Sequence, residues 1–247
     1  MTTIVSANDV YKFFGKGASQ TAVLREVDFQ VAEGEFVCIM GPSGSGKSTL
    51  LHLVSGLDEL SAGEIELFGQ NLAALTQHQR TLLRRQSIGY VFQFFNLLPN
   101  LTVLENVGLP LAIQGRRPKA ESGMVLGLLN RFGLSERASA FPHQISGGQM
   151  QHTSIARALA GGQPLLLCDE PTGNLSQKAG LEVMQTLRRV CDNDGRSVLL
   201  VTHNPRDAGF ADRVLFLVDG ELKKEPVLEG PDIPVQRIHE TLAALSI

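Results

Sequence analysis

Two short segments of this 247-residue sequence carry residue types that can hold a phosphate group and activate water against it. The segment Gly41-Pro-Ser-Gly-Ser-Gly-Lys-Ser48 fits the spacing G-x-x-x-x-G-K-[S/T]. Its glycines let the backbone wrap a phosphate so that several N–H groups point inward at the start of a helix. Lys47 would reach the β- and γ-phosphates, and the Ser48 hydroxyl would ligate Mg²⁺. The spacing therefore predicts a nucleotide phosphate site.

The second segment, Leu165-Leu-Leu-Cys-Asp-Glu170, is an apolar run that ends in two acids. Its four apolar residues predict a buried strand beside the phosphate loop. Asp169 at the end of the strand would hold Mg²⁺ through water, and Glu170 would polarise the attacking water. Strands often end in acidic residues, so this segment alone would be weak evidence for a metal site. Together with the phosphate loop upstream, it becomes strong evidence.

Elements that can position these residues surround both segments. The apolar run Phe36–Met40 predicts a strand that leads into the phosphate loop, and Thr49–Ser55 continues from the loop as a helix. Short apolar runs that alternate with helical patterns are typical of an α/β sheet with crossover helices. The other expected features are strands at Ile4–Tyr11, Val23–Val31, Leu165–Cys168, Val198–Val201 and Val214–Val218, a turn at Gly15–Ser19, and a hairpin at Asp219-Gly220.

The middle of the chain has a helical pattern instead. Residues 102–134 show no convincing strand, and we expect helix there, broken at Pro110 and again at Gly115–Pro118. A helical insertion between two parts of one sheet is the simplest organisation. Residues 225–247 contain three prolines and then a short amphipathic stretch.

Composition limits the class of protein. With 43% hydrophobic and 19% charged residues the chain can bury a substantial core, and its net charge of −3 argues against a protein that grips nucleic acid. Three widely spaced cysteines exclude a disulfide framework and a zinc cluster. The sequence has no long apolar run and no secretory signal, so we expect a cytoplasmic chain.

A third segment separates the possible classes of phosphate-binding protein. No N-K-x-D sequence that would read guanine occurs, which disfavours a GTPase, whereas a small-molecule kinase could share the phosphate loop. Ile145-Ser-Gly-Gly-Gln149 lies 20 residues before the acid-ended strand and opens a helix expected over Gln149–Ala160. It therefore predicts a second helix N-terminus that can receive anions.

With these segments the chain resembles the ATP-binding subunits of ABC transporters, from about Ile4 to Glu221. The phrases GPSGSGKSTLL, VFQFFNLLPNLTVLENVGLPL and DEPTGNL look most like the lipoprotein-releasing, macrolide-efflux and FtsE-like cell-division branch. Six ordered motifs carry the resemblance: the phosphate loop Gly41–Ser48, the glutamine loop Val91–Gln93, the signature Ile145–Gln149, the acidic strand Leu165–Glu170, the following Pro171–Leu175 and the histidine switch Val201–His203.

That resemblance implies an α/β fold: a P-loop NTPase core with a RecA-like parallel sheet, an antiparallel β subdomain and an inserted α-helical subdomain. The chain would be a single ABC ATP-binding domain. Its core would take residues 1–92 and 163–224, its helical subdomain residues 93–162 with the signature, and its tail residues 225–247.

The resemblance also implies a head-to-tail homodimer that sandwiches two ATP molecules, each touched by the signature of the other chain. Gln93 would contact Mg²⁺ and report the γ-phosphate to a membrane partner, and His203 would bind the γ-phosphate and the attacking water. Tyr11 would stack on adenine, a place that Phe13 or Phe14 could also take. The implied sets are catalytic Glu170, His203 and Gln93; ATP-binding Tyr11, Gly41, Pro42, Ser43, Gly44, Ser45, Gly46, Lys47, Ser48 and Thr49; signature Ser146, Gly147, Gly148 and Gln149; and metal-binding Ser48, Gln93 and Asp169.

ATP and Mg²⁺ are the implied cofactors, and a separate permease of FtsX/MacB-like type is the implied partner, with the ATPase peripheral on the cytoplasmic face of the inner membrane. The work could be efflux, lipoprotein release or mechanotransmission. Two alternatives stay open. One is a low-turnover, ATP-gated scaffold; the other is a soluble ABC-type ATPase that acts on DNA or ribosomes, which usually has coiled-coil insertions or two ATPase halves.

Three positions depart from the family pattern. Ser176 stands where an aspartate usually follows Gly-Asn-Leu, His152 stands where the signature helix usually has an arginine, and Asn204 replaces the aspartate after the switch histidine. Because the first two changes each remove a fixed charge, we expect a functional but slow ATPase.

Two further groups of residues have both an ordinary and a functional interpretation. The pairs Arg84-Arg85 and Arg116-Arg117 fit a solvated face with acid partners, or contact with anionic lipid or a permease. Three phenylalanines around Gln93, at positions 92, 94 and 95, fit partial burial or a docking groove for a helix of the membrane partner.

Overall fold

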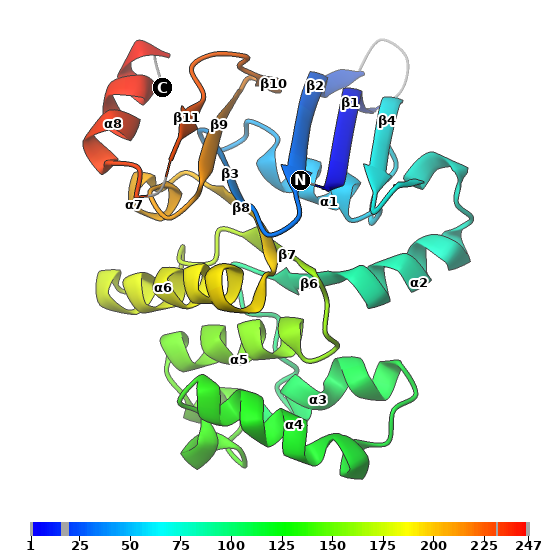
Figure 1. Ribbon diagram of the computed structural model, residues 1–247, viewed down its shortest axis with the longest axis vertical. Coiled ribbons are helices and arrows are strands. Elements are labelled where there is room, and N and C mark those ends of the chain that lie inside the picture. Colours follow the sequence, from blue (N-terminus) through cyan, green and yellow to red (C-terminus); the bar gives the residue numbers. More distant parts are fainter. Residues whose placement is uncertain (1, 16–19, 231, 246–247) are drawn as a thin grey trace.

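Two β-sheets organise the part of the chain that the computed structural model describes, residues 2–15, 20–230 and 232–245. The larger sheet has the strand order β10-β9-β3-β8-β7-β6, with β11 also paired to β9, and the five strands from β9 to β6 run parallel (Figure 1). Its strands are β3 (Phe36–Met40), β6 (Ile88–Val91), β7 (Leu165–Asp169), β8 (Ser197–Thr202), β9 (Arg213–Val218), β10 (Glu221–Leu222) and β11 (Leu228–Glu229).

Alternate residues of these central strands enter two different hydrophobic clusters, one on each face of the parallel sheet. In β3, Phe36, Cys38 and Met40 join one cluster, whereas Val37 and Ile39 join the other. The strands β7, β8 and β9 divide their residues in the same way. Both faces are therefore covered, which explains why these strands are apolar throughout rather than alternating with polar residues.

The smaller, antiparallel sheet has the order β2-β1-β4-β5 and shares its apolar cluster with α1 and one face of the parallel sheet. In Figure 1 its long strands stand beside β3, with α1 at their base. This layer consists of β1 (Thr3–Phe14), β2 (Thr21–Ala32), β4 (Ala62–Leu67) and β5 (Gln70–Asn71), with α1 (Lys47–Val54) and α2 (Gln77–Ser87) next to it.

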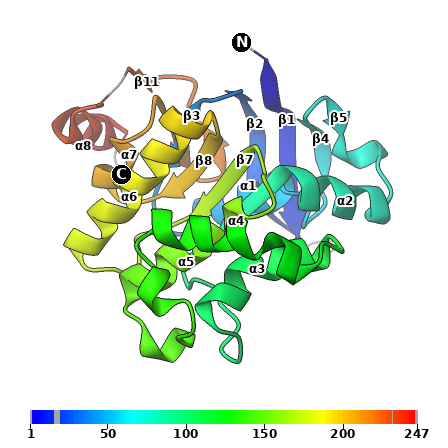
Figure 2. The same cartoon turned by 60° about the horizontal axis from the view of Figure 1, so that its bottom comes forward.

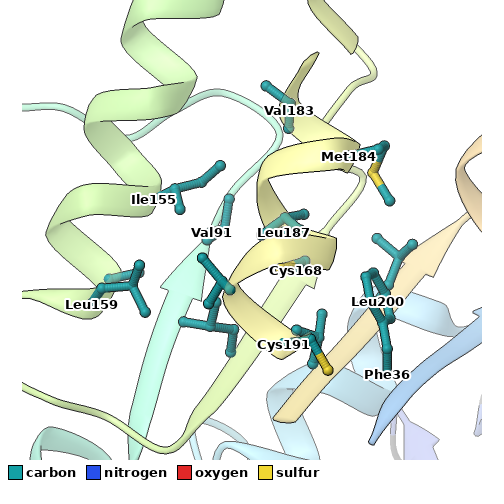
Figure 3. Packing of buried hydrophobic residues seen from close by; sticks show 14 of the residues in the cluster. Phe36, Val91, Ile155, Leu159, Cys168, Val183, Met184, Leu187, Cys191 and Leu200 are labelled. Atoms are coloured by element: carbon teal, nitrogen blue, oxygen red, sulfur yellow. The ribbon is translucent and has the colours of Figure 1, made fainter. Parts of the chain in front are cut away.

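Helices cover the opposite face of the parallel sheet. Val183 and Leu187 of one helix and Ile155 and Leu159 of another pack onto Cys168 and its neighbours (Figure 3). Further helices extend this layer away from the sheet, as Figure 2 shows. These further helices are α3 (Val103–Ile113) and α4 (Pro118–Arg131), whereas the two that pack directly onto the sheet are α5 (Gly147–Leu159) and α6 (Gln177–Asp194). The helices α7 (Pro205–Ala208) and α8 (Val235–Ala244) add residues to the same apolar cluster.

The expected strands and the expected P-loop architecture are confirmed, with strand ends that differ by a few residues. Positions 16–19 of the expected turn lie outside the described residues. The amphipathic stretch of the tail forms α8, whose Ile238 is fully buried. Within the part of the chain that the structure describes, no helix is both long enough and apolar enough to cross a membrane.

The expected helix break at Pro110 is wrong, because α3 continues through it to Ile113. Proline lacks the N–H that would bond the carbonyl four residues earlier, but Pro110 lies in the last turn, where one bond is lost. Val103, Val107 and Leu111 form a buried stripe along α3. That packing outweighs the lost hydrogen bond, whereas Gly115 does end the helical path before α4 begins.

Candidate active site

The phosphate loop connects β3 to α1, and close contacts require glycine at two of its positions. A Cβ on Gly41 would lie 2.0 Å from the carbonyl oxygen of Leu217. Gly46 has a φ of +102°, and a Cβ there would lie 2.7 Å from Leu24 Cδ2. Since α1 begins at Lys47 without a side-chain cap, its first backbone N–H groups are left to bind a ligand.

Lys47 supplies a cation at this helix start. Its side chain is 5% exposed, and Nζ donates hydrogen bonds to the carbonyls of Gly41 (2.9 Å) and Pro42 (2.8 Å). The same Nζ lies 3.9 Å from Glu170 Oε1. Burial lowers the pKa of the Lys47 ammonium, and the carboxylates of Glu170 and Asp169 oppose that shift. Phosphate oxygens would find a partly desolvated positive charge here.

Asp169 reaches the phosphate loop from a strand that does not pair with β3, because β8 lies between β3 and β7. Parallel strands present their carboxyl ends at one edge of the sheet, and there Ser48 Oγ donates to Asp169 Oδ1 at 2.9 Å. Burial raises the pKa of the Asp169 carboxyl, and the hydrogen bond from Ser48 acts against the rise. Carboxylate and hydroxyl oxygens placed together in this way suit a hard cation such as Mg²⁺.

Glu170 and the switch histidine line the same cavity, which has a volume of about 360 Å³. Glu170 Oε1 lies 3.0 Å from His203 Nδ1, and the Glu170 backbone N–H donates to the carbonyl of Val201 at 3.0 Å. The φ of Glu170 is +44°, a left-handed conformation that is costly for a residue with a side chain. Tertiary contacts on both sides hold this carboxylate where β7 and β8 end.

Gln93 lies against the segment that follows Glu170. A Cβ on Gly173 would lie 2.7 Å from Gln93 Nε2, and Asn174 Nδ2 donates to the Gln93 carbonyl at 3.0 Å. Of the three neighbouring phenylalanines, Phe94 is 71% exposed, and the other two are half-buried. Partial burial therefore accounts for two of these aromatic side chains.

The signature residues form a capping box at the start of α5. Ser146 Oγ accepts from the Gln149 N–H at 3.3 Å, while Gln149 Oε1 accepts from the Ser146 N–H at 3.0 Å. Gly148 lies close to α6, where a Cβ would meet Ala179 Cβ at 3.3 Å. Across the described residues, no hydrogen bond or ion pair joins Ser146–Gln149 to the phosphate loop of the same chain.

Tyr11 lies on β1, within the antiparallel sheet. Its ring stacks on Phe13 with a centroid separation of 6.1 Å and an angle of 15° between ring planes. The next residue, Lys12, pairs with Leu24 of β2, the residue that packs beside Gly46. Through this strand pairing, the aromatic pair lies on the strand next to the one that contacts Gly46 of the phosphate loop.

Comparison with known families decides what kind of site this is. The family model described as ABC transporter matches residues 24–173 of the chain. This chain belongs to the ABC transporter ATP-binding family. It is an ATP-binding and ATP-hydrolysing subunit of the lipoprotein-releasing and macrolide-efflux branch, as the following relatives show.

An uncharacterized ABC transporter ATP-binding protein of Methanocaldococcus jannaschii is 43% identical over 235 residues, which cover 93% of this chain and 99% of the relative. The lipoprotein-releasing system ATP-binding protein LolD of a Shewanella species is 42% identical and covers 89% of this chain and 95% of LolD. The macrolide export ATP-binding/permease protein MacB of Marinobacter nauticus is 41% identical, but this chain spans only 36% of it.

Solved dimeric structures of one ATP-binding cassette share the fold of this ABC ATPase. A dimeric post-hydrolysis structure of that cassette with ADP and phosphate is 41% identical, with a TM-score of 0.83, and covers 92% of this chain and 99% of the cassette. A second dimeric structure of the cassette has a TM-score of 0.84. The P-loop NTPase fold of this chain is therefore that of an ABC cassette.

Two of the three departures from the family pattern keep a structural role. Ser176 Oγ accepts from the Ala179 N–H at 3.4 Å and caps α6, and Asn204 Oδ1 accepts from the Arg206 N–H at 3.1 Å and caps α7. Serine, asparagine and aspartate are comparably good N-caps. The ABC ATPase thus retains both helix starts while it loses two negative charges.

The third departure, His152, has a half-buried side chain between α5 and its neighbours. Its ring lies 6.3 Å from that of Phe132, and its Nε2 is buried without a hydrogen-bond partner in the described structure. Burial lowers the pKa of this imidazole, Arg189 lowers it further, and Glu182 opposes both. The neutral ring behaves here as a packing residue rather than as the fixed cation of the family.

Two buried polar residues near the site, Gln151 and Asp207, lie outside every motif by which this ABC ATPase is identified from its sequence. Gln151 is fully buried and Asp207 is 4% exposed, and both hydrogen-bond to segments next to Glu170 or His203. For Asp207 the sequence does hold a signal, because it lies in the first turn after the helix cap Asn204-Pro205. For Gln151 only its place on the buried stripe of α5 could have indicated a structural role.

Proposed function

We propose that this ABC ATPase closes around two ATP molecules as a head-to-tail dimer and thereby drives a separate membrane permease. The contact between Glu170 Oε1 and His203 Nδ1 at 3.0 Å, with Lys47 Nζ 3.9 Å from the same carboxylate oxygen, carries the proposal for hydrolysis. The dimeric structures of the similar cassette support the proposed closure. So does the capped signature segment, which makes no hydrogen bond or ion pair to the described phosphate loop of its own chain.

In this proposal each residue has a defined task. The loop Gly41–Thr49 binds the phosphates of ATP through its backbone N–H groups and Lys47. Glu170 accepts a proton from the attacking water, and His203 orients that carboxylate and binds the γ-phosphate. Tyr11 stacks on adenine, and residues 146–149 bind the ATP held by the other chain. Positioning and electrostatic stabilisation then supply most of the catalysis.

Mg²⁺ fits the oxygen donors that gather at the loop. Ser48 and Asp169 would hold the ion together with Gln93, and burial of the Asp169 carboxyl makes a cation favourable at that position. When bound, the ion neutralises charge that develops on the β- and γ-phosphates. Gln93, packed against Gly173, would relay the state of the site to the helical segment of residues 93–162.

A groove of about 300 Å³ between the glutamine loop and α3 is the proposed docking place for a helix of the permease. Its apolar floor includes Tyr90, stacked on Phe92 at 4.2 Å, and its edge includes Ile113, which is 51% exposed. Arg85 lines the same groove and supplies positive charge on the side that would face the membrane. By contrast, Arg116 is paired with Glu121 at 2.8 Å.

The proposed partner is an FtsX/MacB-like permease with few membrane spans and a large extracytoplasmic domain. The names of the LolD and MacB relatives favour release of a lipoprotein or export of a macrolide. We place the ATPase on the cytoplasmic face of the inner membrane, where such a permease would present its intracellular loops.

Two measurements test the proposal. Glu170→Gln should abolish ATP turnover and preserve ATP binding, while Glu136→Gln, a change of an exposed glutamate outside the cavity, should leave turnover unchanged. Purification of the tagged chain from detergent-solubilised membranes should recover a few-span permease in stoichiometric amount. Turnover by the Glu170→Gln variant at the parent rate contradicts the catalytic assignment. Recovery without any membrane protein supports a scaffold or a soluble ATPase instead.

A further inference from the structure

Asp207 is a buried carboxylate to which the proposed hydrolysis assigns no role. It is 4% exposed, and three neutral groups donate to it: Thr172 Oγ1, Asn204 Nδ2 at 3.1 Å and Thr202 Oγ1 at 3.5 Å. No lysine or arginine of the described chain forms an ion pair with it. Its carboxylate is thus held entirely by side chains of two loop segments.

Those two segments are the ones that carry the proposed catalytic groups. Thr172 lies two residues after Glu170 on the segment beyond β7, and Thr202 and Asn204 flank His203 at the end of β8. The Thr202 hydroxyl also accepts from the Asn204 N–H at 3.0 Å, which fixes the backbone on both sides of the histidine. One carboxylate therefore links the two segments at the level of the contact between Glu170 and His203.

This arrangement costs free energy in the folded chain. Burial raises the pKa of the Asp207 carboxyl, and the three hydrogen bonds act against that rise. An apolar side chain would fill the same space without this desolvation cost, and an unpaired buried charge is seldom kept for packing alone. The carboxylate is therefore better explained by the need to hold Thr172, Thr202 and Asn204 in fixed positions.

The substitution at position 204 fits the same arrangement. Aspartate is expected there from the family pattern, but two carboxylates 3.1 Å apart could not both remain ionised. With asparagine at 204, its amide N–H donates to Asp207 while its oxygen still caps α7. The buried negative charge of this chain thus lies three residues after the position where the family pattern has an aspartate.

We propose that Asp207 is a positioning residue for ATP hydrolysis, which holds the segments of Glu170 and His203 together and takes the place of the aspartate that the family pattern has at 204. This inference rests on the roles proposed above for Glu170 and His203. Small displacements of catalytic groups lower turnover strongly, so loss of the link should reduce kcat and leave ATP binding intact.

A charge-exchange series tests the proposal in the full chain, with kcat, KM for ATP and Tm measured for each variant. Asp207→Asn should lower kcat about tenfold, with KM within about twofold of the parent. Asn204→Asp should also lower kcat, because it sets two carboxylates against each other. The double exchange, Asn204→Asp with Asp207→Asn, restores one carboxylate and one amide and should recover kcat to within about threefold of the parent.

Asp212→Asn is the matched control, because Asp212 accepts from the Phe36 N–H at 2.8 Å and pairs with Arg188 at the opposite end of the sheet. It should lower Tm without lowering kcat. Thr172→Val provides a second route if the carboxyl variants fold poorly, and it too should reduce kcat. Parent kcat in Asp207→Asn or in Thr172→Val would overturn the proposal, as would a double exchange no faster than the slower single variant. Parent turnover in Glu170→Gln would instead overturn the underlying function.

Discussion

The side-chain amide of Gln151 joins the loops that follow two neighbouring parallel strands, β6 and β7. Its Nε2 donates to the carbonyl of Pro171 at 2.7 Å and to that of Phe92 at 3.3 Å. Pro171 follows Glu170, and Phe92 precedes Gln93, so the helix that begins with the signature is bonded to both. A movement of α5 toward a second chain would therefore displace the glutamine loop and the acidic segment together.

We predict that Gln151→Leu lowers the free energy of unfolding by about 2 kcal/mol, because it removes the donor to the buried carbonyl of Pro171 and to the partly buried carbonyl of Phe92. ATP turnover should fall as well, since both loops lose their common anchor. Urea unfolding and steady-state turnover measure the two effects. Gln185→Leu, on an exposed position of α6, is the control and should change stability by less than about 0.5 kcal/mol. Equal stability of the two variants would contradict the structural role.

His152 predicts a dependence of stability on pH. Burial and Arg189 lower the pKa of the folded imidazole below the unfolded value of about 6.5, with Glu182 opposing them. The folded state then binds fewer protons than the unfolded state. The stability associated with this group is complete above that unfolded pKa and decreases as the pH falls below it.

The measurement is the free energy of unfolding between pH 7.5 and pH 5 for the parent and for His152→Gln. The parent should lose more stability over this range than the variant. His78→Gln, at an exposed position on α2, is the control and should follow the parent. An identical pH dependence of the His152→Gln variant and the parent would show that the ring is not desolvated as the structure indicates.

Much of the fold could be predicted from the sequence because the central strands are buried on both faces and therefore appear as continuous apolar runs. The strand Phe36–Met40 was predicted with its observed bounds for this reason. The strand β6 was missed, since Ile88-Gly-Tyr-Val91 is short and follows a polar helix without a turn signal. The helix break expected at Pro110 does not occur, because the packing of the buried residues of α3 outweighs the hydrogen bond that the proline loses.

The site could be predicted as far as its motifs extend. The structure brings the five motif residues together because each lies at or shortly after the carboxyl end of a parallel strand: Lys47, Ser48, Asp169, Glu170 and His203. What the sequence could not predict is the link between these segments. Gln151 and Asp207 bond to residues 20 or more positions away, and a local pattern that marks such a residue does not show which distant segment it will contact.

The departures at Ser176 and His152 predict that restoring the family's charges accelerates hydrolysis. Ser176→Asp keeps the cap of α6, because aspartate accepts from the same N–H group, and it returns a negative charge to the loop that would lie between the two active sites of the proposed dimer. His152→Arg places a permanent positive charge where the Glu182 carboxylate can attract it. We expect kcat of the double variant to rise severalfold, with Tm changed little. A double variant no faster than the parent would mean that these positions do not limit turnover.

If the permease docks in the proposed groove, a change at its rim should weaken permease binding without changing basal ATP hydrolysis. Ile113→Glu adds a charge at the rim of the groove, where a helix of the permease would have to desolvate it. Recovery of the permease with the tagged chain should fall about tenfold or more, and basal ATP turnover without permease should remain at the parent value. Leu126→Glu is the control, because Leu126 is similarly exposed, at 48%, but lies on α4 outside the groove. Undiminished recovery with Ile113→Glu, or an equal loss with both variants, would place the permease on another surface of the ATPase.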